Sequence, residues 1–187
     1  AGVGFALDGT TERLYFVERA TGYVFVADPK KNSVVRVTNT LQPKIYEAHV
    51  GGKGSVVLRS LTDSGRITTF SGTIPTYQQD ASTSPQTLKG SQLDADIMAL
   101  SMNSKTQGLF YVINDANSGP VGVTSDNNGA NRKRLFSSGV LGWRPIYLPD
   151  GKTFIVQNAA DATPGSAYDV SAGTMRPVVT NVPGLTF

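Results

Sequence analysis

Short apolar runs separated by turn residues extend along the whole length of this chain. Between residues 144 and 158, for example, the run Ile146-Tyr147-Leu148 leads into Pro-Asp-Gly, and a second apolar run, Phe154–Val156, follows at once. Runs of this length, bounded by Asp-Gly or Gly-rich turns, predict β-strands joined by hairpins. No segment combines an apolar spacing of 3.6 residues with helix caps, so we expect almost no helix.

The same succession of strands and turns recurs along the chain. The segments Gly4–Thr40 and Pro145–Asn181 both show a strand, an Asp-Gly turn, an apolar strand, a polar loop, a strand, a short loop and a last strand with Val-Thr-Asn. Two weaker copies lie between them, at residues 44–74 and 96–138. The aspartates of the first and last Asp-Gly turns are 142 residues apart, which is three periods of about 47. This period is close to the ~40–50 residues of a β-propeller blade.

The chemistry of the strands separates those inside a sheet from those at its outside. Leu14–Val17, Ser55–Leu58 and Leu109–Ile113 are apolar on both faces, as expected for strands of a sheet that is covered on both sides. Gly22–Asp28 and Arg66–Ser71 alternate more and are expected to meet solvent. We predict an all-β fold, a single β-propeller domain over 1–187 in which up to four antiparallel strands make each blade, with blades at approximately 1–40, 41–93, 94–140 and 141–187.

Composition and charge exclude several classes of protein. Charged residues make up 17% of the chain, against roughly 25% in an average soluble domain, and the 20 glycines and 10 prolines suit a turn-rich β protein. The absence of cysteine excludes disulfides, zinc–thiolate sites and cysteine nucleophiles. A net charge of +3 is too small to indicate nucleic acid as a partner. No run of about 18 or more apolar residues exists, so we expect no transmembrane segment.

The repeat resembles the blades of TolB-like and WD40-like β-propellers. In TolB-like blades a Pro-x-x-Ser-Pro-Asp-Gly-Lys turn joins the first two strands, and a strand with Arg-x-Leu-Thr closes the blade. Trp143–Lys152 is similar to the first element and Ala6–Gly9 matches it in part, while Ser33–Thr40, Asn131–Ser138 and Met175–Asn181 resemble the second. These motifs are structural, since Asp-Gly makes the turn and Pro ends the strand. The resemblance implies a bacterial propeller of six to eight blades, outside the cytoplasm in the periplasm or at the cell surface, of which these blades are a part.

No catalytic or metal-binding constellation stands out among the polar residues. His49 is the only histidine and lacks a recognisable partner, so we interpret it as a structural or surface residue. Asp94 and Asp96 have a spacing that glycoside hydrolysis or calcium binding could use, but a solvated loop is the simpler interpretation. The basic runs Lys30–Lys31 and Arg132–Arg134 suit either anion binding or a solvated rim. We predict no catalytic residue, no metal and no cofactor.

One face of a propeller is the natural place for a ligand. The loops between second and third strands and the links between successive blades meet there, and here they are rich in Asn and Asp, with one Trp. Trp and Arg often anchor interfaces, although an indole at a blade entrance can instead pack against the neighbouring blade. The predicted ligand-binding residues are Arg19, Asn114, Trp143, Arg144 and Asn158.

The predicted function follows from the fold and from this face. We expect a non-catalytic binding or scaffold module that contacts proteins or cell-envelope polymers, with a protein or glycan partner and no nucleic acid. Two alternatives stay open: the propeller domain of a hydrolase or peptidase whose catalytic part lies outside this chain, and a carbohydrate-binding propeller. An open arc of blades leaves apolar blade faces exposed, because each blade depends on its neighbours to cover its core. We therefore expect the chain either to be a fragment of a longer protein or to associate through its end blades.

Overall fold

Every regular element in the described part of the chain is a β-strand. Sixteen strands and no helix are present among these residues, which confirms the all-β prediction. The strands form four sheets of four, and all neighbours within a sheet are antiparallel. Gly9 of the first Asp-Gly turn and the basic pair Lys30–Lys31 lie outside the described residues. The structure, a computed structural model, describes residues 1–8, 11–28, 32–77, 84–161 and 163–186.

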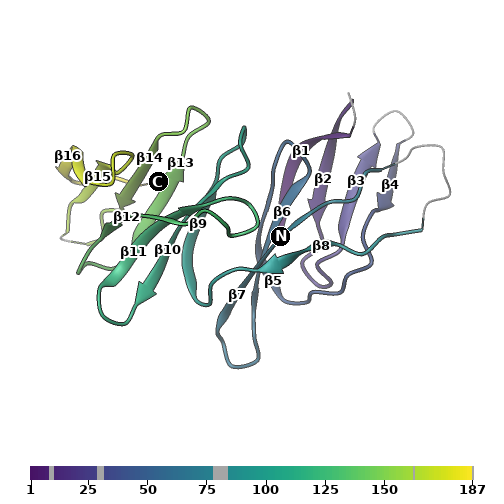
Figure 1. The fold of residues 1–187 in the computed structure, drawn as a ribbon, viewed down its shortest axis with the longest axis horizontal. Coiled ribbons are helices and arrows are strands. Elements are labelled where there is room, and N and C mark those ends of the chain that lie inside the picture. The colour runs from purple at the N-terminus through teal and green to yellow at the C-terminus, as the bar shows by residue number, and fades with distance from the viewer. Residues whose placement is uncertain (9–10, 29–31, 78–83, 162, 187) are drawn as a thin grey trace. The chain divides into compact units, whose positions relative to one another are not determined.

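The chain divides into two compact units, residues 1–95 (unit 1) and 96–187 (unit 2). Each unit contains two sheets, and each sheet takes its four strands in chain order (Figure 1). The strands of unit 1 are β1 (Gly2–Asp8), β2 (Thr11–Val17), β3 (Val24–Asp28), β4 (Ser33–Arg36), β5 (Ile45–Val50), β6 (Ser55–Leu61), β7 (Ile67–Thr73) and β8 (Lys89–Gln92). The strands of unit 2 are β9 (Ile97–Met102), β10 (Leu109–Asp115), β11 (Gly119–Ser125), β12 (Lys133–Ser137), β13 (Trp143–Tyr147), β14 (Thr153–Gln157), β15 (Gly165–Asp169) and β16 (Arg176–Val182).

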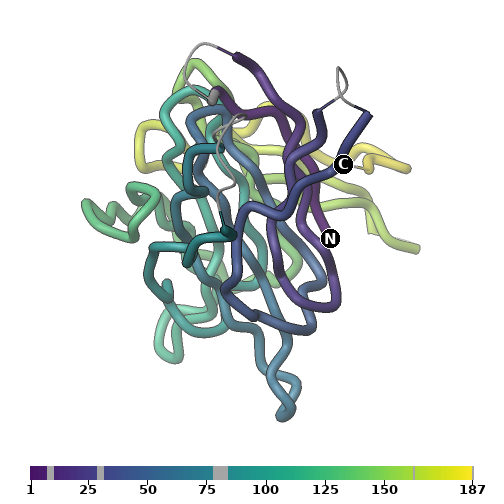
Figure 2. The backbone as a smooth tube through the Cα atoms, turned by 90° about the vertical axis from the view of Figure 1, so that its right-hand side faces the viewer, coloured from purple at the N-terminus to yellow at the C-terminus, as the bar shows by residue number. Residues whose placement is uncertain are grey.

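The turn at Asp150-Gly151 is tight. Between β13 and β14, the Leu148 N–H donates to the Lys152 carbonyl at 2.9 Å, and the Gly151 N–H donates to the Leu148 carbonyl at 3.0 Å. Gly151 has a φ of +91°, a conformation that glycine adopts without strain. A hairpin turn of the same length joins β6 to β7, with the Thr62 N–H donating to the Arg66 carbonyl at 2.9 Å, and it extends at the bottom of Figure 2.

Glycines allow the two sheets of unit 1 to approach to backbone distance. A Cβ at Gly2 would lie 2.1 Å from the carbonyl oxygen of Ala48, and a Cβ at Gly4 would lie 2.7 Å from that of Val50. Strand β1 can therefore lie against β5 only because these two positions lack a side chain. Between the sheets lies an apolar core that includes Ala6, Tyr15, Val17, Val24 and Val26 from the first sheet and Ile45, Val56 and Leu58 from the second.

An aromatic core and a buried amide join the two sheets of unit 2. The side chain of Asn103 is fully buried, and its Nδ2 donates to the Leu148 carbonyl at 2.5 Å. Its Oδ1 accepts the backbone N–H groups of Lys105 and Thr106, each at 2.9 Å. Asn103 thus fixes the loop before β10 and ties it to the β13–β14 turn. The apolar core of the unit includes Phe110, Val112, Leu135, Phe136, Trp143, Ile155 and Val170.

Burial follows the position of a strand within its sheet. Val56, Val57 and Leu58 of β6 are fully buried, as expected for a strand that is apolar on both faces. The third strand β3 alternates between buried and partly buried residues, so it meets solvent less than its sequence predicts. The reason is that a fourth strand occupies the outer edge of each sheet, and β8 and β16 are exposed along almost their whole length.

Candidate functional site

The five predicted binding residues are divided between the two units. Arg19 lies in unit 1, in the exposed turn after β2, whereas the other four lie in unit 2. Asn114 is exposed near the end of β10. Trp143 and Arg144 begin β13, and Asn158 follows directly after β14, the strand paired with β13. The structure therefore brings Trp143, Arg144 and Asn158 to the same end of one strand pair.

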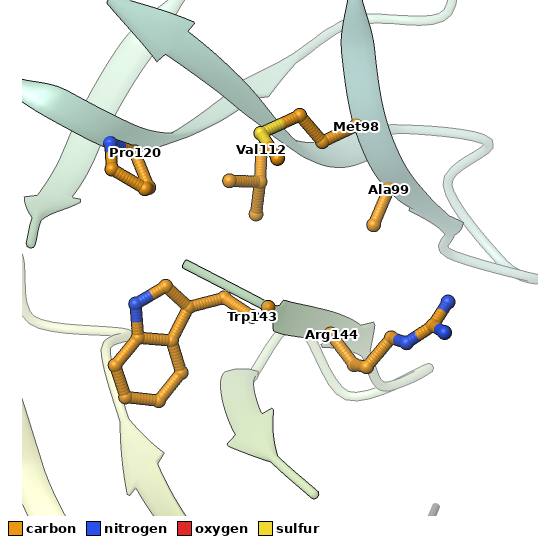
Figure 3. Close-up of a pocket in the computed structure, with 7 residues that line it drawn as sticks. Met98, Ala99, Val112, Pro120, Trp143 and Arg144 are labelled. Atoms are coloured by element: carbon orange, nitrogen blue, oxygen red, sulfur yellow. The ribbon is translucent and has the colours of Figure 1, made fainter. Parts of the chain in front are cut away.

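A pocket of about 220 Å³ lies beside this end of β13 (Figure 3). Trp143 and Arg144 line it, but their side chains point in opposite directions, as neighbours on a strand do. Small-molecule sites usually measure about 300–1,000 Å³, so this pocket has room for a side chain of a partner rather than for a whole ligand. The other lining residues are Met98, Ala99, Val112, Pro120 and Gly142.

Trp143 is mainly a core residue. Its side chain is edge-on to Phe136, with ring centroids 6.2 Å apart, and to Tyr168, with centroids 5.8 Å apart. Its Nε1 is buried and has no hydrogen-bond partner among the described residues. The ring edge that carries this nitrogen faces Pro120 across the pocket (Figure 3). Most of the indole thus packs inside unit 2, while the neighbouring Arg144 is exposed.

Several large exposed apolar side chains lie on the first sheet. On β1, Val3, Phe5 and Leu7 point away from the core of unit 1, and each is more than half exposed. The strand register continues this face across β2 and β3 to Val34 on β4, which is 59% exposed, and places the exposed Glu12 and Arg36 on the same side as its members. Within it the rings of two phenylalanines stack with centroids 5.3 Å apart and planes at 9°. We call the following eight residues the first-sheet apolar face: Val3, Phe5, Leu7, Leu14, Phe16, Phe25, Ala27 and Val34.

The alternation of small and large residues in β1 indicates this face, although the order of strands and turns does not. Strand β1 alternates small residues (Gly2, Gly4, Ala6) with large apolar ones. The small residues face the second sheet at backbone distance, so the large ones must point the other way. Leu14–Val17 was expected to be covered on both faces, but on β2 only Tyr15 and Val17 are buried, while Leu14 and Phe16 lie on this partly exposed face.

A cluster of charged side chains engages the only histidine. In this cluster Glu47 Oε1 lies 2.8 Å from His49 Nε2, and Glu47 Oε2 accepts a hydrogen bond from the Arg59 guanidinium. The Arg59 guanidinium also lies 5.3 Å from the centroid of the Tyr46 ring. Burial raises the pKa of Glu47, but the hydrogen bond with His49 and the charge of Arg59 outweigh it, so the pKa lies below its ordinary value of 4.5. Glu47 is therefore ionised at neutral pH and holds the other two side chains in place.

The described residues and the comparisons with known proteins say little about metal binding, membrane insertion or family. Among the described residues, no three His, Cys, Asp or Glu side chains are grouped so as to hold a metal ion. In the same part of the chain no helix has the length and apolar character needed to cross a membrane. No protein-family model matches the sequence, and a search of curated proteins finds no significant match.

Proposed function

We propose that this chain is a non-catalytic binding module made of propeller-type blades, and that it binds through the first-sheet apolar face. The four sheets support the blade interpretation, since each has four antiparallel strands in chain order. The resemblance of Trp143–Lys152 to the turn of TolB-like blades supports the same assignment, and with it a location outside the cytoplasm. The observation that carries the proposal is the exposed apolar face, because large contiguous apolar surfaces usually mark sites of interaction.

The size of the face decides what kind of partner can bind it. Four of its side chains are more than half exposed. Fully burying such a side chain is worth ~1.5–3 kcal/mol, so completing their burial provides about 4 kcal/mol. Association itself costs ~4–15 kcal/mol, so a partner that covered these four side chains alone would bind weakly. Stable binding needs a partner as wide as the sheet, which also covers the partly buried Leu14, Phe16 and Phe25.

A second copy of this chain offers such a surface. The opposite face of the first sheet already packs against another four-stranded sheet, so sheet-on-sheet packing is the kind of contact that this sheet makes. On the last sheet, the side that points away from Trp143 carries the exposed Arg144, the partly buried Ile146 and Phe154, and also Val179, which is exposed. A contact between the first sheet of one copy and the last sheet of another is head-to-tail, and it either closes into a ring or continues as a chain. We therefore infer self-association through the end sheets.

Sedimentation velocity over a range of protein concentrations tests this proposal. Phe5→Asp places a charge within the first-sheet apolar face, and Leu141→Asp changes a residue of the same 59% exposure outside it. We expect the native chain and the Leu141→Asp variant to associate as concentration rises, and the Phe5→Asp variant to stay monomeric with an unchanged far-ultraviolet circular dichroism spectrum. A native chain that is monomeric at every concentration, or equal association by the two variants, overturns the proposal.

A further inference from the structure

A second and larger pocket, of about 550 Å³, lies at the opposite end of the β10–β11 hairpin from the first. Its position follows from the strand register, since Leu109 at the start of β10 pairs with Ser125 at the end of β11. The loop before β10, the loop after β11 and the end of β13 surround it. Its volume falls within the ~300–1,000 Å³ of small-molecule sites. The lining residues are Thr106, Gly108, Ser125, Tyr147 and the run Asp126–Asn128.

Hydrogen bonds within the two loops hold the pocket in shape. Asn103, which is fully buried, fixes the loop before β10 and ties it to the Leu148 carbonyl. In the loop after β11, Asn131 Nδ2 donates to Asp126 Oδ2 at 2.6 Å, and the Gly129 N–H donates to the Asp126 carbonyl at 3.0 Å. A site that is formed in advance loses little conformational entropy when a ligand enters.

Tyr147 provides one aromatic wall. Its ring is edge-on to Phe110, with centroids 6.4 Å apart at 83°, and its backbone N–H donates to the Ser101 hydroxyl at 3.0 Å. These contacts fix the ring in position. Gly108 keeps the space beside the ring open, because a Cβ at that position would lie 3.3 Å from Tyr147 Cε1. The pocket thus presents a fixed aromatic surface to any ligand.

The remaining walls are polar and carry no positive charge. Thr106 and Ser125 contribute hydroxyl groups, and Asn127 and Asn128 contribute amides, which both donate and accept hydrogen bonds. The one charged lining residue among those described is Asp126, and no Lys or Arg accompanies it. An anionic ligand would meet this carboxylate without a compensating cation, so the wall disfavours phosphates and acids. These walls suit a ligand that is not anionic, is rich in hydroxyl groups and has one apolar face.

We propose that this pocket binds a neutral saccharide in its pyranose form. A pyranose ring has an apolar face of C–H groups, which packs against the Tyr147 ring, and a rim of hydroxyl groups, which hydrogen-bond with the amides, hydroxyls and carboxylate of the wall. The pocket shares no residue with the first-sheet apolar face. The proposal of a saccharide site can therefore be tested independently of the proposal of self-association.

Titration of the native chain with neutral sugars, followed by backbone amide chemical shifts, tests the proposal. The probes are glucose, N-acetylglucosamine and the β-1,4-linked tetramers of each, so that the experiment separates a free monosaccharide from a chain. We expect a Kd of about 1 mM or tighter for at least one probe. The largest shifts are expected at residues 106–108, 125–128 and 147. The absence of shifts with all four probes overturns the proposal.

Matched substitutions assign the binding to this pocket. Gly108→Val fills the space beside Tyr147, whereas Gly139→Val introduces the same side chain where a Cβ meets no atom within 4 Å. We expect the first to weaken binding by about tenfold or more and the second to leave the Kd unchanged. Tyr147→Leu keeps apolar bulk but removes the aromatic ring, and it is expected to weaken binding similarly. If Gly108→Val does not fold, Tyr147→Leu decides, and binding that persists in that variant overturns the proposal.

Discussion

Replacing Trp143 by alanine is expected to destabilise unit 2 strongly. The indole is 6% exposed and makes edge-to-face contacts with Phe136 and Tyr168. Truncating a buried Trp to Ala usually costs about 3–5 kcal/mol, and the two aromatic contacts place this site in the upper half of that range, at about 4 kcal/mol. In a unit of this size each kcal/mol lowers the melting temperature by about 4–8 °C. We therefore expect thermal unfolding, followed by far-ultraviolet circular dichroism, to shift downward by about 15–30 °C.

Two companion variants test the reasoning behind that magnitude. Trp143→Phe removes ring volume but no hydrogen bond, because Nε1 has no partner among the described residues, so we expect a loss of only about 1–2 kcal/mol. Leu141→Ala changes an exposed neighbour in sequence and should stay within about 0.5 kcal/mol of the native chain. If Trp143→Ala melts within about 2 °C of the native chain, the indole does not support the core and the reasoning is refuted.

Three further substitutions test other parts of the structure. Gly4→Ala drives a Cβ into the carbonyl of the adjacent sheet and should cost about 1–3 kcal/mol in urea unfolding, while Gly139→Ala, in open space, should be neutral. Asn103→Ala leaves buried backbone groups without partners and should cost about 2–4 kcal/mol; native-like melting would show that the amide does not hold its loop. The lowered folded-state pKa of Glu47 means that its ionised form stabilises unit 1 fully above about pH 4.5, and that this stability disappears as pH falls through the lowered value. Glu47→Gln should therefore flatten the acid side of a stability–pH curve, and an unchanged slope contradicts the pairing with Arg59.

Local patterns predicted the strands because strand and turn signals act over a few residues. Asp150-Gly151 specified a tight hairpin, and the apolar runs on either side became β13 and β14. Burial was harder to predict, since it depends on which strand takes the outer edge of a sheet. Strand β8 shows this clearly: Lys89–Gln92 is polar and exposed at every position, and its pairing with β7 rather than its own composition makes it a strand.

The candidate sites depended on contacts that a single sequence does not reveal. Trp143 was predicted as a binding residue from its residue type. The sequence places the start of β13 only approximately, so it did not predict that the side chains of Trp143 and Arg144 point in opposite directions. The pocket proposed for a saccharide combines three segments about twenty positions apart: the register of β10 with β11 brings residues 106–108 beside 125–128, and the packing of Tyr147 on Phe110 adds β13. Asn103 has no distinguishing local pattern, and its role is visible only from the loop and the turn that it joins.

The chain has no cysteine, so the reactivity of a single introduced thiol reports on one position. Measuring that reactivity is the most direct test of binding through the first-sheet apolar face. Val34→Cys places a thiol within that face, and Leu141→Cys places one at a site of equal exposure outside it. The rate of alkylation by iodoacetamide is measured for each variant from low to high protein concentration. We predict that alkylation of the Val34→Cys variant slows as concentration rises while that of the Leu141→Cys variant does not. Equal rates for the two variants at every concentration would contradict the claim that this face is a binding surface.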